Sequence, residues 1–166
     1  MEIHIEGVEK VNARLAALGP EVLRAADRGL RAAGKEIIAD AKENLRSNHI
    51  NATGRLSNSG FVQPVADGSG YDVGFMSDKA YAGAVEYGRR AGRMPPPDEM
   101  GQWAYQKLRI RDRKLARAAG WGLAKHIAEH GTQPHPFFKP AVDKNQPRIA
   151  AAVRDAVQQV TNRTNV

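Results

Sequence analysis

Apolar residues recur every three or four positions between Glu21 and about Arg46. This spacing places them on one face of an α-helix, so it predicts a long amphipathic helix of about 26 residues and ~39 Å. A shorter stripe of the same kind precedes it, and Gly19-Pro20 separates the two. The long stripe consists of Val22, Ala26, Leu30, Ala33, Ile37, Ala41 and Leu45, and the shorter one of Val8, Val11, Leu15 and Leu18.

Other stretches alternate apolar and polar residues, which is the period of a half-buried strand. Residues 2–6 form one such stretch near the start of the chain. Phe61–Val65 and Tyr71–Phe75 flank the turn Asp67–Gly70, a pattern typical of a β-hairpin. Pro64 lacks a backbone donor, so it favours an edge position for its strand.

The second half of the chain predicts helices separated by glycine and proline. Lys79–Tyr87 predicts a short helix that Gly88 ends. Asp98 is in position to cap the next short helix, which would contain Trp103. A further helix should end by Gly131, and its apolar stripe is Leu115, Ala119, Leu123 and Ile127.

Asn145 and Pro147 give the cap and first-turn signals of a last amphipathic helix, and residues 160–166 are expected to fray. Together the elements predict an α+β fold. In this fold a small antiparallel or mixed sheet, made of the N-terminal strand plus the hairpin, is packed by a long N-terminal helix and a C-terminal helix. No long linker divides the chain, so residues 1–166 are expected to form a single domain.

Composition indicates that the core is thin. Hydrophobic residues make up 42% of the 166 residues, but aromatic residues make up only 6%, and alanine is the commonest hydrophobic residue. Alanine buries little apolar area, and thin cores are often completed by oligomerisation. We therefore expect the chain to complete its packing against copies of itself or against other proteins.

Lysine and arginine outnumber aspartate and glutamate by 25 to 18, which gives a formal net charge of +7. Such a charge is compatible with binding to nucleic acid, with acidic protein surfaces, or simply with solubility. The absence of cysteine excludes disulfides and thiolate metal sites. No apolar run approaches the ~20 residues of a membrane span, and no signal-peptide core is visible, so we expect a soluble intracellular product without membrane contact.

Two groups of residues offer candidate chemistry. His126 and His130 lie four positions apart, a spacing at which neutral imidazoles can share a metal. The pattern lacks a third ligand, and histidines near a helix C-terminus also interact favourably with its dipole, so neither a metal nor another cofactor is predicted. For Glu86, accepting hydrogen bonds from a loop or from Arg55 is favoured over catalysis, because no partner acid or histidine lies nearby in the sequence. No catalytic residue is predicted, and the chain is not expected to be an enzyme.

The densest basic stretch lies between residues 107 and 117. A nucleic-acid surface needs such charge to neutralise phosphates. Interleaved aromatic residues are absent and no known module spacing appears, so a solvated or subunit-facing surface is favoured over a nucleic-acid face. The basic residues are Lys107, Arg109, Arg111, Arg113, Lys114 and Arg117.

The segment Gly131-Thr-Gln-Pro-His-Pro-Phe-Phe-Lys-Pro-Ala141, here called the strap, presents two aromatic rings on a rigid backbone. Its prolines fix φ and push the residues before them toward extended conformations. If one ring turns inward, extended geometry predicts that the other turns outward. We expect the pair either to plug the chain's own core or to anchor a neighbouring subunit. The candidate interface residues are Arg89, Arg90, Arg93, Pro95, Phe137, Phe138 and Pro140.

Three segments carry a family resemblance: Thr53-Gly54-Arg55-Leu56, then Tyr81-Ala-Gly-Ala-Val-Glu-Tyr-Gly88, then the strap. With the long helix and the hairpin, they resemble the tail-completion and neck proteins of long-tailed bacteriophages over nearly the whole chain. Many relatives carry Thr where Arg89 follows Gly88 here, and the long basic insert before the strap is a further departure. The motif residues to which the resemblance assigns a structural role are Thr53, Gly54, Leu56, Tyr81, Glu86, Tyr87 and Gly88.

The resemblance implies a structural virion protein of the phage head–tail joining region, acting in tail completion or as a neck ring. Such a protein would form a homo-oligomeric ring, with a hexamer favoured and a dodecamer as the alternative. The ring would contact head connector or closure proteins and tail tube or terminator proteins, with DNA passing through its lumen without sequence-specific contact. It would assemble in the bacterial host cytoplasm and be located in the virion. The alternative is a basic nucleic-acid-binding protein of a mobile element, whereas a histidine-dependent hydrolase would need a carboxylate cluster that the sequence does not show.

Overall fold

The computed structural model describes residues 2–4, 19–48, 50, 53–66, 68, 70–76 and 79–164. The predicted stripe of Val8, Val11, Leu15 and Leu18 lies outside these residues. The described strands are β1 (Glu2–His4), β2 (Gly60–Pro64) and β3 (Tyr71–Phe75). The described helices are α2 (Pro20–Ser47), α3 (Arg55–Asn58), α4 (Lys79–Tyr87), α5 (Pro97–Lys107), α6 (Arg113–His130) and α7 (Phe138–Thr164).

These elements form two compact units whose sequences are interleaved. Unit 1 consists of residues 1–44, 60–76 and 138–166, and unit 2 consists of residues 45–59 and 77–137. The expectation that residues 1–166 form a single domain stays a prediction. The α+β class is confirmed, since long N- and C-terminal helices accompany a small antiparallel sheet.

Unit 1 is built around a three-stranded sheet with the order β1-β3-β2, in which both pairs are antiparallel. Val73 in the central strand pairs with Ile3 of β1 and with Val62 of β2. The predicted N-terminal strand and hairpin are therefore confirmed, and Pro64 lies on an edge strand as expected.

Helix α2 packs its apolar stripe on this sheet. Gly34 faces the side chains of Val62 and Val73 so closely that a Cβ added to it would lie 3.0 Å from Val62. At the start of β3, the hydroxyl of Tyr71 donates a hydrogen bond of 2.6 Å to Asp27 Oδ1, which ties this strand to the same helix. The stripe residues Val22, Ala26, Ala33, Ile37 and Ala41 are all buried, as predicted.

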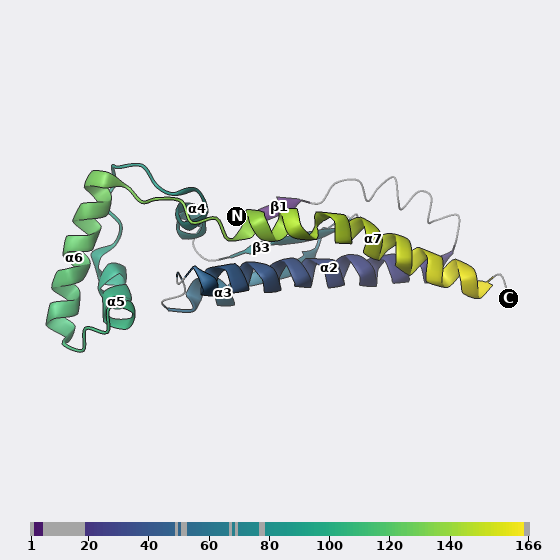
Figure 1. Cartoon of the computed structure of the whole chain (residues 1–166), viewed down its shortest axis with the longest axis horizontal. Helices are drawn as coiled ribbons and strands as arrows, with labels where there is room; N and C mark the ends of the chain where they lie inside the picture. Colours follow the sequence, from purple (N-terminus) through teal and green to yellow (C-terminus); the bar gives the residue numbers. More distant parts are fainter. Residues whose placement is uncertain are drawn as a thin grey trace. The chain divides into compact units, whose positions relative to one another are not determined.

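Helix α7 runs antiparallel to α2 in unit 1 (Figure 1). Val153, Val157 and Val160 pack against Val22 and Ala26 near the start of α2. Toward the other end, the carboxylate of Asp40 accepts hydrogen bonds of 2.6 Å from Asn145 Nδ2 and 2.9 Å from Lys144 Nζ. The ring of Phe138 meets Phe75 of β3 edge-on, with the centroids 5.7 Å apart.

The predicted start of the last helix was wrong. The helix begins at Phe138, and Pro147 lies inside it. Pro140 falls in the first turn, where backbone N–H groups have no intrahelical partner, so the helix accepts it. Asn145 is buried and donates to Ala141 O instead of capping the helix. The helix is described to Thr164, and the expected fraying of residues 160–166 stays a prediction.

Unit 2 contains α3, α4 and the hairpin of α5 and α6. Small residues, namely Gly101 and Ala104 on α5 and Ala116, Gly120 and Ala124 on α6, are the buried residues of this pair. A Cβ added at Gly120 would lie 2.3 Å from the backbone nitrogen of Gly101, so the two helices approach almost backbone to backbone. The stripe predicted on α6 was therefore displaced by one position, and Leu115 is 60% exposed.

Two of the three helix ends predicted in this unit are confirmed. Gly88 and Gly131 follow α4 and α6 with positive φ, as predicted. Asp112 caps α6 by accepting hydrogen bonds from the N–H groups of Lys114 and Leu115. Asp98, however, lies inside the first turn of α5 and is not its cap, because Pro96 occupies that position. None of the helices in the described part of the chain combines the length and the apolar character that crossing a bilayer requires.

Candidate functional site

The second and third signature segments lie side by side in unit 2. Arg89 and Thr132 exchange two backbone hydrogen bonds, of 3.0 and 2.8 Å. The N–H of His135 donates to Val85 O at 2.7 Å. Residues separated by about 50 positions thus form one junction, in which the strap closes over the end of α4.

Glu86 fixes this junction from within. Its side chain is 2% exposed, and its Oε2 accepts a hydrogen bond of 2.8 Å from the backbone N–H of Phe137. The strap before Phe137 belongs to no helix or strand, so this N–H needs an acceptor from elsewhere. The carboxylate of Glu86 supplies it, which is the structural role expected from the sequence.

Gly88 allows the strap to pass this closely. Its φ is +73°, and a Cβ in its place would lie 2.6 Å from the carbonyl oxygen of Thr132. Both the left-handed backbone and the close approach require glycine. The Glu-Tyr-Gly triplet therefore combines a buried acceptor with a turn that lets the acceptor reach the strap.

A cavity of about 370 Å³ opens beside the junction, still within unit 2. Its walls are mostly apolar and come from α4, α5, α6 and the strap. The lining includes Ile50, Tyr81, Val85, Met100, Trp103 and Ile127. A concave apolar surface with a few polar groups at its edge is suited to receiving a side chain or short segment of a partner.

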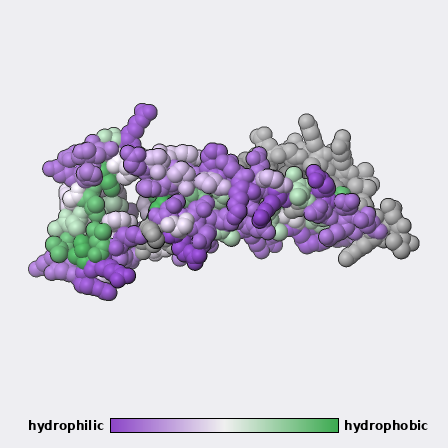
Figure 2. Space-filling model, viewed as in Figure 1, coloured by the Kyte–Doolittle hydropathy of each residue, from purple (hydrophilic) through white to green (hydrophobic). Residues whose placement is uncertain are grey.

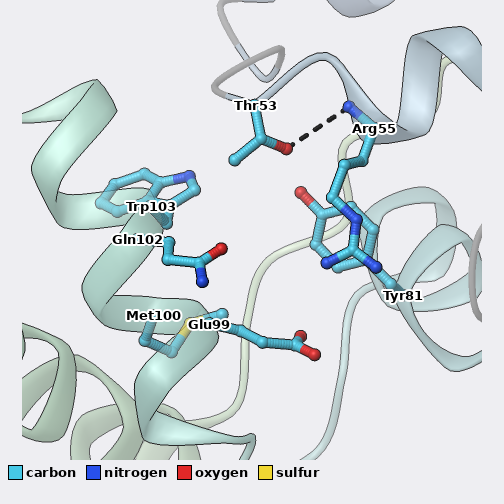
Figure 3. Close-up of a pocket in the computed structure, with 7 residues that line it drawn as sticks. All are labelled: Thr53, Arg55, Tyr81, Glu99, Met100, Gln102 and Trp103. Carbon is cyan, nitrogen blue, oxygen red and sulfur yellow. Dashed lines mark hydrogen bonds between the residues drawn. The ribbon is translucent and has the colours of Figure 1, made fainter.

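A smaller cavity of about 60 Å³ shares Tyr81, Met100 and Trp103 with the larger one (Figure 3). The T-G-x-L segment borders it, and the N–H of Arg55 donates a long hydrogen bond of 3.4 Å to Thr53 Oγ1. Burial raises the pKa of the Tyr81 hydroxyl; Glu99 adds to this effect and Arg55 opposes it. All three signature segments therefore contribute to one apolar region of unit 2.

The structure corrects the prediction for the aromatic pair. Phe137 is 0% and Phe138 is 1% exposed, so both rings lie inside the chain and neither is presented to a partner. The predicted alternation fails because extended backbone ends at Phe137 and α7 begins at Phe138. The strap plugs the chain's own interior, which was the other use foreseen for it.

The remaining predicted interface residues lie in the loop after α4 and in the first turn of α7. Arg90, Arg93 and Pro140 are exposed, and Pro95 borders the larger cavity. Arg89 is half-buried, and its guanidinium donates to the carbonyl oxygen of Arg93. Their role at an interface stays a prediction.

Among the motif residues, Leu56 is buried, Gly54 has a φ of +73° before α3, and Tyr87 is 68% exposed.

Large apolar side chains on the outside of the α5–α6 hairpin were not foreseen. Leu108 and Trp121 are each 52% exposed, in addition to Leu115. Figure 2 shows hydrophobic residues gathered over this hairpin. The signal that could have revealed them is the run of small residues at 116, 120 and 124, because a close helix contact through Ala and Gly leaves the bulky neighbours outside.

The histidines form no metal site with other ligands in the described part of the chain, where no cluster of three potential ligands occurs. The rings of His126 and His130 stack with centroids 4.3 Å apart. His130 Nδ1 lies 3.1 Å from the carbonyl oxygen of His126, which is a helix-end contact.

Residues 9–88 match the family model described as "Bacteriophage HK97-gp10, putative tail-component". The match spans α2, the hairpin, the T-G-x-L segment and α4. It confirms the resemblance to phage tail proteins for this part of the chain. The strap and the α5–α6 hairpin lie outside it. No curated protein and no solved structure matches the chain.

Proposed function

We propose that this relative of phage tail components is a structural protein of the head–tail joining region, which completes the tail or forms a neck ring around the DNA channel. Copies of the chain assemble into a ring, hexameric by preference, by heterologous contacts that close through rotation. The ring joins the head connector or closure proteins to the tail tube or terminator proteins. Its role is assembly in the virion, and it requires no catalytic turnover.

The observation that carries this proposal is the exposed apolar surface of the α5–α6 hairpin. Leu108, Leu115 and Trp121 are each more than half exposed on one small helical pair. An apolar surface of this kind on a soluble chain is typical of a protein interface, and tryptophan is enriched among the residues that dominate binding energy.

The cavity beside the junction supplies the complementary half of such a contact. It is concave, mostly apolar and about 370 Å³ in volume, and it lies in the same unit as the exposed residues. In a heterologous ring each subunit uses one surface toward one neighbour and a different surface toward the other, so a projecting face and a hollow are both needed. The loop 89–97, which borders the cavity at Arg89 and Pro95, orders against the neighbouring subunit.

The test is the oligomeric state of the purified protein, alone and mixed with a tail-tube protein, by native mass spectrometry and negative-stain microscopy. Rings are expected in at least one condition. The double substitution Leu115→Ser with Trp121→Ser should abolish them while the melting temperature stays close to that of the parent, because both residues are on the surface.

Met76→Ser is the matched control, since Met76 is 65% exposed but belongs to unit 1. Parent protein that remains monomeric in both conditions would overturn the proposal. Equal assembly of the control and the double variant would exclude the hairpin as the assembly surface.

A further inference from the structure

The net charge of this protein lies entirely in one of its two units. Unit 1 contains 12 Lys and Arg residues against 12 Asp and Glu, whereas unit 2 contains 13 against six. The whole excess of +7 therefore belongs to residues 45–59 and 77–137. A charge balance this uneven indicates a surface adapted to an anionic partner.

Within unit 2 the cations concentrate where α5 connects to α6. Five of the nine positions from 109 to 117 carry exposed cations, here called the cationic surface: Arg109, Arg111, Arg113, Lys114 and Arg117. Arg113 and Arg117 lie four apart on α6, so their side chains share one face of the helix about 6 Å apart along its axis.

A groove of about 600 Å³ borders this face. Arg113 and Arg117 line it from α6, and Gln102, Tyr105 and Gln106 line it from α5. These guanidinium, amide and hydroxyl groups are the side chains that most often donate hydrogen bonds to phosphate oxygens. Asp98 also lines the groove, and its Oδ1 lies 3.3 Å from Arg117 Nε. Both side chains of that pair are at least 70% exposed, so the pair is weak and a phosphate can replace the carboxylate.

We propose that the cationic surface and its groove bind the phosphate backbone of duplex DNA without reading its sequence. Duplex DNA carries one negative charge per about 1.7 Å of its axis, which suits several cations held on one rigid hairpin. These side chains would donate to phosphate oxygens and not to the edges of the bases, so duplexes of all sequences should bind alike.

This inference goes beyond the assembly role proposed above and does not depend on it, because DNA binding and ring formation are measured separately. In a ring, the surface would contact the passing DNA through exchangeable contacts to its phosphates. The same surface would bind DNA if the chain were monomeric.

The test is fluorescence anisotropy with a labelled 30-base-pair duplex, titrated with the full chain at several salt concentrations between 50 and 200 mM. Replacing Arg113 and Arg117 together by Gln should weaken binding about tenfold or more at 100 mM salt. The slope of log affinity against log salt should fall in magnitude by about 2, since each lost phosphate contact removes about 0.9.

The matched control is Arg24→Gln with Arg28→Gln, a pair of exposed arginines that also lie four apart on a helix, but in unit 1. This control should leave the slope and the affinity unchanged. Equal weakening of both variants, or no binding of the parent at 50 mM salt, would overturn the proposal. Competition by polyglutamate as effective as that of unlabelled duplex at equal charge would also overturn it and would point to an acidic protein partner. Equal binding of two duplexes of unrelated sequence is expected.

Discussion

A single buried carboxylate connects the second and third signature segments of this chain. Glu86 lies on the last turn of α4, and its Oε2 holds the backbone of Phe137 across 51 positions of sequence. The acceptor role could be predicted from the sequence, because Glu86 lies among apolar residues and has no nearby acid or histidine that catalysis would need. The sequence could not identify Phe137 as the donor, because nothing local links the two residues.

Removing this acceptor should destabilise the protein. Glu86→Met keeps the approximate volume but leaves the Phe137 N–H buried without this partner, and we expect a loss of about 2 kcal/mol in the free energy of unfolding. Glu86→Gln should lose less, because the amide oxygen can still accept the hydrogen bond. Urea denaturation followed by circular dichroism measures both changes. A Met variant as stable as the parent would contradict the role assigned to Glu86.

The aromatic pair shows the limit of local reasoning. The alternation rule applies to extended backbone, and the residues Pro134 and Pro136 made an extended strap the natural expectation. The change to helix at Phe138 places both rings inside the chain. The ring of Phe138 packs edge-on against Phe75, a residue 63 positions away, and no sequence pattern near the strap records this contact.

The α5–α6 hairpin depends on glycine at its closest contact. Gly120→Ala should be strongly destabilising, by about 3 kcal/mol or more, because the new Cβ would lie 2.3 Å from backbone atoms that cannot move aside cheaply. Thermal unfolding would measure the loss.

Gly122→Ala on the same helix is the matched control. A Cβ at Gly122 meets no atom within 4 Å, so the change should stabilise the helix by about 0.5–1 kcal/mol. Similar stabilisation by both substitutions would show that the two helices do not pack through Gly120.

The regular spacing of apolar residues predicted the elements well where the apolar residues are the ones that face inward. The limits of α2 and α4 and both hairpin strands followed from apolar spacing and from Gly88. The pattern failed on α6, where the residues of greatest hydrophobicity were assumed to face inward. There the backbone approach at Gly120 buries alanine and glycine and leaves Leu115 exposed. It failed again at Pro147, because proline inside a helix is rarer than proline at its start.

Helices α2 and α7 are tied together by polar contacts as well as by their apolar faces. The hydrogen bond from Asn145 is the main reason that the pKa of Asp40 lies below its usual value, and the hydrogen bond from Lys144 adds to this effect. A carboxyl whose pKa is lower in the folded state than in the unfolded state stabilises the fold above its unfolded pKa. This stabilisation is lost as the pH falls below about 4.

Asp40→Asn should therefore cost about 1–2 kcal/mol at pH 7 and much less near pH 3, where the parent's own carboxyl is protonated. Urea midpoints at both pH values provide the measurement. Asp143→Asn, which removes one half of an exposed ion pair with Lys139, should change stability little at either pH. An equal loss for Asp40→Asn at pH 3 and pH 7 would show that its charge is not what stabilises the contact.

The interleaving of the two units also has a consequence during synthesis. Val22 and Ala26 of α2 are covered by Val153, Val157 and Val160, which the ribosome adds more than 120 residues later. Translation proceeds at roughly 5–20 residues per second, so α7 is synthesised on the order of ten seconds after α2. Throughout that interval its apolar stripe is open to chaperones and to nascent copies on neighbouring ribosomes of the same messenger.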